Sequence, residues 1–280
     1  MNSTVQASVC LCIVVGMAIS SPVLIAQDLI EQDQPTISTV SRAKNAVGDI
    51  IRDAALIIKN VFSANSFAVI VATFPAFVIG GMCDGALQKK FYDRKHHKNL
   101  HQASEFWQGL ARFGIVFPIF MSCAFSIDAR NEDLKETSRL FLVGFPFVGY
   151  TRKLIKKLDV DREYCLRPWH EQFSREKRAH GGFPSGHVAI ATYAAALYGM
   201  RFGPRAAIPL GAYAVFTALT FVTCNRHYIS QTIAGAGLGF LFACAVSTVV
   251  DQRLNERRDF SIDANIDAQG SPVIKVAWRF

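Results

Sequence analysis

Six apolar windows follow one another between residues 61 and 250. They cover residues 61–83, 113–127, 140–151, 187–200, 206–225 and 228–250. A helix needs about 20 apolar residues to cross a bilayer. The second, third and fourth windows are marginal by this measure, and each fits a buried core helix as well. The pattern predicts an all-α, membrane-embedded bundle of about six helices over residues 61–250.

Residues 1–60, before the bundle, contain three stretches of different hydropathy. Residues 1–26 end in an apolar run with small residues, but no Lys or Arg precedes that run, so they read as a signal-like or transmembrane segment. Residues 27–60 read as a polar linker followed by an amphipathic helix from about Val40 to Val61. That helix is expected to lie on the membrane surface or to cover the bundle. Its apolar side carries Val47, Ile50, Ile51, Ala54, Ala55 and Ile58.

The final segment, residues 251–280, reads as a polar tail with a small β-hairpin. Polar and apolar residues alternate over 260–266 and again over 273–280, and the residues between them favour a turn. The chain is too short for a β-barrel beside the six windows. We therefore expect a hairpin packed on the bundle.

Composition supports the membrane prediction. Hydrophobic residues make up 51% of the 280 residues, 22 of them are phenylalanine, and the net charge is +8. A strongly basic stretch at residues 89–98 follows the first window. Since it lacks interleaved aromatic residues for stacking on bases, it favours acidic lipid headgroups or phosphorylated substrates over nucleic acid.

A candidate anion site lies at the start of the fourth window. Pro184, Ser185 and Gly186 predict a turn, and Ser185 is a good residue to begin a helix. Backbone N–H groups at a helix start favour an anion, most often a phosphate. His187 would stand within reach to donate a proton. Ser-Gly-His alone is a weak signal, because a capping serine beside a surface histidine is common.

The neighbours of this turn strengthen the signal. Lys156, Lys157 and Arg167 lie upstream and are cations of the kind that bind phosphate. His227 lies 40 residues downstream of His187, before another apolar helix. Two antiparallel helices fit between them, so the chain is expected to return and bring the two histidines together.

These motifs resemble those of the type-2 phosphatidic acid phosphatase and vanadium haloperoxidase superfamily. The resemblance rests on Arg167-Pro168, on Pro184 to His187, and on His227 followed by Ser230, Ala234 and Gly235. It implies a six-helix membrane bundle, with no metal and no cofactor for phosphatase chemistry. It also implies that His227 attacks phosphorus, that His187 protonates the leaving oxygen, and that Arg167, Ser185 and Gly186 bind the phosphate.

The chain departs from this family at three positions. Val160, Phe221 and Gln231 stand where the family has a lysine, a second arginine and an aspartate. Lys156 or Lys157 could replace the lysine, and Arg226 the arginine. Gln231 could still orient His227 through its amide oxygen, but without the negative charge that stabilises a charged imidazole.

The predicted function is hydrolysis of a lipid phosphomonoester or pyrophosphate through a phosphohistidine. Basic residues at 201–205 and 253–258 are expected in the cytoplasm. The site would then face the other side, the periplasm if this is a bacterial inner-membrane protein. One alternative is a catalytically silent member that binds phospholipid headgroups, and another is the soluble acid-phosphatase branch. The oligomeric state stays open.

Overall fold

The computed structural model describes residues 37–93, 95–96, 98–100, 105–157, 166–168, 181–266 and 272–278. The signal-like segment at 1–26 and most of the linker lie outside this range. The described helices are α2 (Ile37–Val61), α3 (Ala64–Phe91), α4 (Glu105–Asp128), α5 (Glu132–Lys157), α7 (Gly186–Phe202), α8 (Pro204–Thr223) and α9 (Ile229–Asp259). The strands are β1 (Tyr92–Asp93), β2 (Lys98–Asn99), β3 (Phe260–Ile266) and β4 (Pro272–Trp278), paired as β1–β2 and β3–β4.

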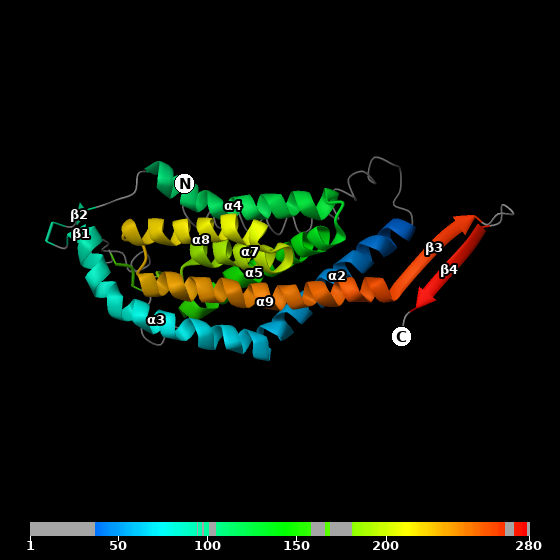
Figure 1. Ribbon diagram of the computed structural model, residues 1–280, viewed down its shortest axis with the longest axis horizontal. Helices are drawn as coiled ribbons and strands as arrows, with labels where there is room; N and C mark the ends of the chain where they lie inside the picture. The colour runs from blue at the N-terminus through cyan, green and yellow to red at the C-terminus, as the bar shows by residue number, and fades with distance from the viewer. Residues whose placement is uncertain are drawn as a thin grey trace.

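The helix α7 forms the centre of the bundle, with α5, α8 and α9 packed around it (Figure 1). Its apolar residues are buried between the neighbouring helices and do not form a lipid-facing surface. Tyr193 of α7 stacks on Phe141 of α5 with ring centroids 4.7 Å apart. Leu197 of α7 and Val246 of α9 are fully buried in the same core. Each of the six apolar windows overlaps one helix of this arrangement over most of its length.

Two glycines allow α9 to lie directly on the start of α7. A Cβ atom at Gly235 would overlap the carbonyl oxygen of Ser185, and one at Gly239 would overlap that of Ala189. Small residues permit this close approach of helix backbones. The Ser185 turn is therefore held against α9, which fixes the position of the candidate anion site.

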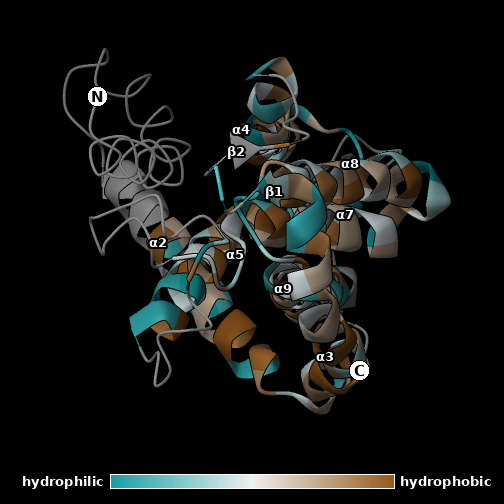
Figure 2. Ribbon diagram, turned by 90° about the vertical axis from the view of Figure 1, so that its left-hand side faces the viewer, coloured by the Kyte–Doolittle hydropathy of each residue, from teal (hydrophilic) through white to brown (hydrophobic). Residues whose placement is uncertain are grey.

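Four helices are long and apolar enough to cross a membrane: α3, α4, α8 and residues Ile229–Arg257 of α9. The third and fourth apolar windows lie in α5 and α7, which are not among these candidates. Large apolar side chains of α3, such as Phe67, Phe74 and Met82, point outward, and hydrophobic residues cover α3 and α8 in Figure 2. The chain is an integral membrane protein.

The face of α2 that packs on the bundle is not the apolar face that the sequence predicts. It buries Asp53 and Ile57 and leaves Val47, Ile51 and Ile58 exposed. The stripe picked out by the apolar periodicity thus points away from the protein. The reason is electrostatic, because the Asp53 carboxylate pairs with two arginines of other helices.

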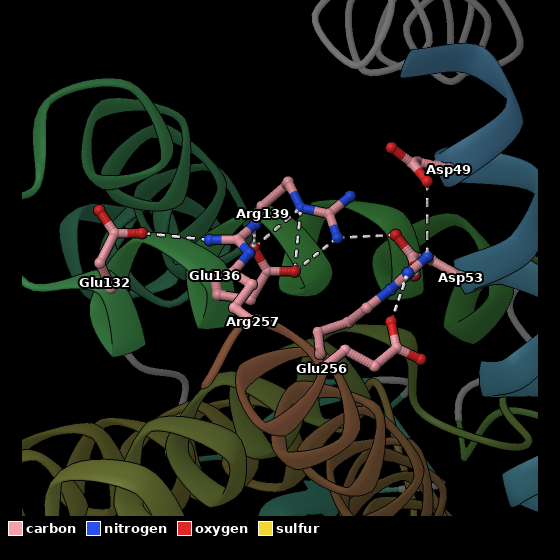
Figure 3. A network of polar contacts seen from close by, with 8 residues as sticks. Asp49, Asp53, Glu132, Glu136, Arg139, Glu256 and Arg257 are labelled. Carbon is pink, nitrogen blue, oxygen red and sulfur yellow. Dashed lines mark hydrogen bonds and ion pairs between the residues drawn. The ribbon is translucent and has the colours of Figure 1, made fainter. Parts of the chain in front are cut away.

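These arginines belong to an ionic network that joins α2, α5 and α9 (Figure 3). Asp53 accepts hydrogen bonds from Arg139 of α5 at 2.7 Å and from Arg253 of α9 at 2.6 Å. Glu136, also buried, accepts from Arg139 and from Arg257 at 2.5 and 2.7 Å. The network lies at the start of α5 and the end of α9, which is the end of the bundle away from the Ser185 turn.

The last described segments extend beyond the bundle. The helix α9 continues past residue 250 to Asp259. The antiparallel strands β3 and β4, with Phe260 opposite Trp278, follow it. They project away from the helices instead of packing on them (Figure 1). The uninterrupted α9 carries the strands outward, which differs from the expected hairpin packed on the bundle.

Candidate functional site

Three short segments meet at one end of the bundle: residues 166–168, the turn at 181–186, and the turn at 224–228. The backbone N–H of Ser185 donates to the carbonyl oxygen of Gln231 at 3.0 Å. This bond joins the start of α7 to the start of α9. Two helices that run out and back, α7 and α8, thus return the chain to the same end. His187 and His227 both contact one aromatic ring there.

The helix α3 supports these segments from the side. The amide nitrogen of Gln88 donates to the carbonyl oxygen of Pro168 at 2.8 Å. The Asp84 carboxylate accepts from the backbone N–H of Ser230 at 3.1 Å and from its hydroxyl. Asp84 thus caps the first turn of α9, whose N–H groups have no partner within the helix. The basic stretch that follows α3 lies at this same end.

The side-chain amide of Gln231 links two of these segments, 166–168 and 224–228. Its Nε2 donates to the carbonyl oxygen of Leu166 at 2.7 Å, and its Oε1 accepts from the backbone N–H of Tyr228 at 3.2 Å. Because a carbonyl can only accept and an N–H can only donate, these two bonds fix the orientation of the amide. The same Oε1 lies 3.4 Å from Nδ1 of His227. Nδ1 is therefore the protonated nitrogen, and Nε2 keeps its lone pair.

The ring of Phe221 packs against both histidines. Its centroid lies 4.6 Å from that of His187 and 5.9 Å from that of His227. The carbonyl oxygen of Phe221 also accepts from the N–H groups of Arg226 and His227 at 2.9 and 3.2 Å. Only 2% of Phe221 is exposed. This residue therefore positions the turn before α9 and packs against the His227 ring.

The start of α7 forms an oxyanion cradle. Ser185 precedes the helix, as expected, but its side chain makes no capping hydrogen bond. Its Oγ is fully buried and has no hydrogen-bond partner among the described residues. A buried hydroxyl without a partner is unfavourable. An anion at the helix start would supply the missing acceptor and would also meet the backbone N–H groups there.

Two cations flank the turn on the side of Gly181. The ammonium group of Lys156 donates to the carbonyl oxygen of Gly181 at 2.6 Å. A Cβ on Gly181, whose φ is +124°, would lie 3.6 Å from Nζ of Lys156 and 4.0 Å from Nη2 of Arg167. Lys156, not Lys157, approaches the site, because the side chain of Lys157 is exposed. Val160 lies outside the described residues.

Sequence reasoning missed two arginines, Arg152 of α5 and Arg112 of α4. A Cβ at Gly186 would overlap Nη1 of Arg152 and would lie 2.8 Å from its Cζ. Arg112 is one of the cations that act on the nearby Arg226 and His187. The spacing of Arg152 and Lys156, four residues apart on one helix face, was the available signal.

Positive charge dominates the electrostatics of the site. Burial, followed by the charges of Arg167, His187 and Lys156, lowers the pKa of His227 well below its ordinary 6.5. Burial together with Arg152, Arg112, Arg226 and Arg167 lowers the pKa of His187, at the start of α7, to about 4. Both rings are therefore neutral at pH 7 when no anion is bound. A bound anion would oppose the arginines and favour protonation of His187.

The donor set suits an oxyanion rather than a metal. Across the described ranges, no three His, Cys, Asp or Glu side chains lie close enough together to hold a metal ion. The groups that converge on the Ser185 turn are instead N–H and guanidinium donors, the partners that phosphate oxygens require.

The fold is that of a membrane-embedded helical protein in which two histidines and several cations lie together at one end of the bundle. Residues 159–255 match the model of the PAP2 superfamily, and this match confirms the family resemblance of the motifs. The matched range contains Arg167, Ser185, His187 and His227 but not Arg152.

One solved structure is similar to the chain. It is the crystal structure of the first transmembrane PAP2-type phosphatidylglycerolphosphate phosphatase from Bacillus subtilis. The TM-score is 0.43 and the sequence identity is 17%, and the match covers 66% of this chain and 96% of that chain. No curated protein matches the chain.

Proposed function

We propose that this protein is a membrane phosphatase that hydrolyses a lipid phosphate or pyrophosphate through a phosphohistidine, at the extracytoplasmic face. The observation that carries the proposal is the orientation of His227. The Gln231 amide oxygen accepts a hydrogen bond from Nδ1–H, so Nε2 is a neutral nucleophile within a cluster of phosphate-binding cations.

The reaction follows from the roles of the two histidines. Nε2 of His227 attacks phosphorus, the bond from phosphorus to the leaving oxygen breaks, and His187 gives that oxygen its proton. Water then attacks the phosphohistidine while His187 takes a proton from it, which releases phosphate and restores His227.

The transition-state charge needs fixed donors around the phosphoryl group. The Ser185 hydroxyl, the Gly186 N–H, Arg167 and Lys156 surround the cradle and stabilise the equatorial oxygens. Arg226, in the turn before His227, adds charge. Because the arginines keep His187 neutral in the empty site, substrate binding is expected to drive its protonation.

A groove beside the site supports a lipid substrate. It has a volume of about 610 Å³ and lies between α7, α8 and α9. It begins at Val188 and Thr232, the neighbours of His187 and Gln231, and continues along α7 to Met200. At 1.5 Å per residue this is about 18 Å, comparable to one half of a hydrocarbon core about 30 Å thick. One hydrocarbon chain of the substrate is proposed to lie in this groove.

A catalytically silent protein that binds phospholipid headgroups is the second candidate. Phe221 and Gln231 favour it, since they replace a cation and an anion of the family site with a neutral ring and a neutral amide. Such a protein would need the cradle and the groove, but it would not need a nucleophilic imidazole.

Phosphate release by the purified protein distinguishes the two functions. The substrates are phosphatidate, phosphatidylglycerophosphate, an isoprenyl pyrophosphate and a lipid A phosphate. The expected result is release that is lost in His227→Ala and unchanged in Lys153→Gln, a substitution at an exposed lysine of α5. Mass spectrometry of acid-quenched protein should find the phosphoryl group on His227. Folded protein that binds these lipids but releases no phosphate would establish the silent alternative.

A further inference from the structure

We propose that Arg152 of α5 binds the phosphoryl group and supplies the cationic contact that Phe221 does not provide. This assignment rests on the proposed function, in that it names a further ligand of the same anion site. Nothing in the matched family segment predicts it, because Arg152 precedes residue 159.

The position of Arg152 is the first support. Its guanidinium lies against Gly186, so closely that a Cβ atom there would overlap Nη1. Gly186 is the first residue of α7, and its N–H is one of the donors of the oxyanion cradle. An anion held by that N–H would therefore meet the Arg152 guanidinium as well.

The second support is that Arg152 has no acidic partner among the described residues. The arginines at the opposite end of the bundle, such as Arg139, Arg201 and Arg253, all pair with carboxylates. Arg152 is partly buried and makes no hydrogen bond or ion pair with any described residue. A buried charge without a counterion is unfavourable. A bound phosphate would remove this penalty.

The geometry of Phe221 is the third support. Its ring packs against both His187 and His227, so α8 presents an aromatic ring and not a cation to the two histidines at this position. The helix α5 approaches the cradle from another side and presents two cations one turn apart. Lys156 reaches Gly181 and Arg152 reaches Gly186, so α5 serves both ends of the turn that binds the anion.

The test compares Arg152→Gln and Arg152→Lys with Lys153→Gln, a substitution at an exposed lysine of the same helix. Turnover of the preferred lipid phosphate and inhibition by orthovanadate are measured, together with direct binding of orthovanadate by thermal shift. Arg152→Gln should lower kcat/KM about 10²-fold, as expected for loss of one donor to an oxyanion. It should also weaken orthovanadate binding at least tenfold. For both quantities, Arg152→Lys should lie between the wild type and Arg152→Gln. Lys153→Gln should stay within twofold of wild type.

A second-site variant tests the link to Phe221. If Arg152 supplies the contact that Phe221 does not provide, Phe221→Arg should restore at least part of the kcat/KM and orthovanadate affinity lost in Arg152→Gln. The comparison with Lys153→Gln decides the outcome even if that double variant does not fold. Wild-type affinity for orthovanadate in Arg152→Gln, or no orthovanadate binding by the wild type, would overturn the assignment. Orthovanadate binding that depends on Arg152, without phosphate release from any lipid, would support this assignment and refute the proposed hydrolysis.

Discussion

The amide oxygen of Gln231 lies 3.4 Å from Nδ1 of His227, and it faces the ring because the amide nitrogen is held elsewhere. A neutral amide thus fixes the tautomer of His227, in place of the aspartate carboxylate that the family has at this position. Gln231→Ala removes the acceptor and lets the ring adopt either tautomer. We expect turnover to fall on the order of 10²–10⁴-fold, the range for a misoriented catalytic histidine. Turnover near the wild-type value, in folded protein, would show that His227 needs no such partner.

The pH profile should report the lowered pKa of His227. The ring must be neutral to attack, and burial together with Arg167 lowers its pKa below 6.5. Activity should therefore persist below pH 6.5 and fall only as the pH drops through the lowered pKa. The free energy of unfolding should also fall as the pH drops below 6.5, because the unfolded chain then binds this proton while the folded chain does not. The measurement is kcat/KM against pH, in which neutral His227 sets the acidic limb and His187, which must be protonated to act, sets the alkaline limb.

Gln231→Glu serves as the matched variant for this profile. It keeps the length of the side chain but adds a negative charge beside the ring, which should raise the pKa of His227. The acidic limb should move to higher pH than in the wild type. An unmoved limb would mean that a different group controls it. The carboxylate would also face the Leu166 carbonyl without a proton to donate, so some loss of stability is expected.

The helices could be predicted from the sequence, because hydropathy is a local property. The six apolar windows overlap α3, α4, α5, α7, α8 and α9 to within three residues at their ends. The motif residues could be found for the same reason, since Ser185 to His187 and Arg167 are recognisable in short stretches. The orientation of the Gln231 amide could not, since it depends on the Leu166 carbonyl 65 residues away in the chain.

Contacts between distant helices limit sequence reasoning in two further places. Arg152 reaches Gly186 only because α5 packs beside α7, and no motif marks it. On α2, the apolar stripe predicted one face, yet the structure buries Asp53 instead. A periodicity rule counts apolar residues and cannot anticipate that a carboxylate will find two arginines on α5 and α9.

Replacing Ser185 should lower activity without lowering stability. Its hydroxyl is fully buried and has no described hydrogen-bond partner. Ser185→Ala should lower kcat about 10²-fold by removing an oxyanion donor. The thermal midpoint should stay the same or rise, because no internal hydrogen bond is lost. Ser230→Ala is the contrasting variant, since the Ser230 hydroxyl donates to Asp84 and its loss should lower the midpoint. A fall in the midpoint of Ser185→Ala would contradict the unpartnered state of its hydroxyl.

The groove between α7, α8 and α9 predicts a dependence on chain length. Gly211 lines it, and a Cβ there would meet no atom within 4 Å. Gly211→Leu should therefore fill the groove without a clash. We expect KM for a long-chain lipid phosphate to rise about tenfold, with little change for a phosphate ester with a short chain. Gly81→Leu is the control, because Gly81 of α3 is also unobstructed but does not line the groove. An equal effect on both substrates would place the hydrocarbon chain elsewhere.

The ionic network at the far end of the bundle should govern stability rather than catalysis. Asp53 is 0% exposed and pairs with Arg139 and Arg253. Asp53→Asn leaves their charges without a partner, so the free energy of unfolding should fall by about 3–5 kcal/mol. Asp49→Asn is the matched control on the same helix. The Asp49 side chain is 63% exposed and lies 3.9 Å from Arg253, so its loss should cost less than about 1 kcal/mol.

Denaturant unfolding in detergent measures the difference in the free energy of unfolding between the two variants. Turnover below the unfolding transition should be unchanged in both, because the network lies at the opposite end of α9 from His227. Equal destabilisation by the two substitutions would mean that the buried pairs do not hold α2 on the bundle.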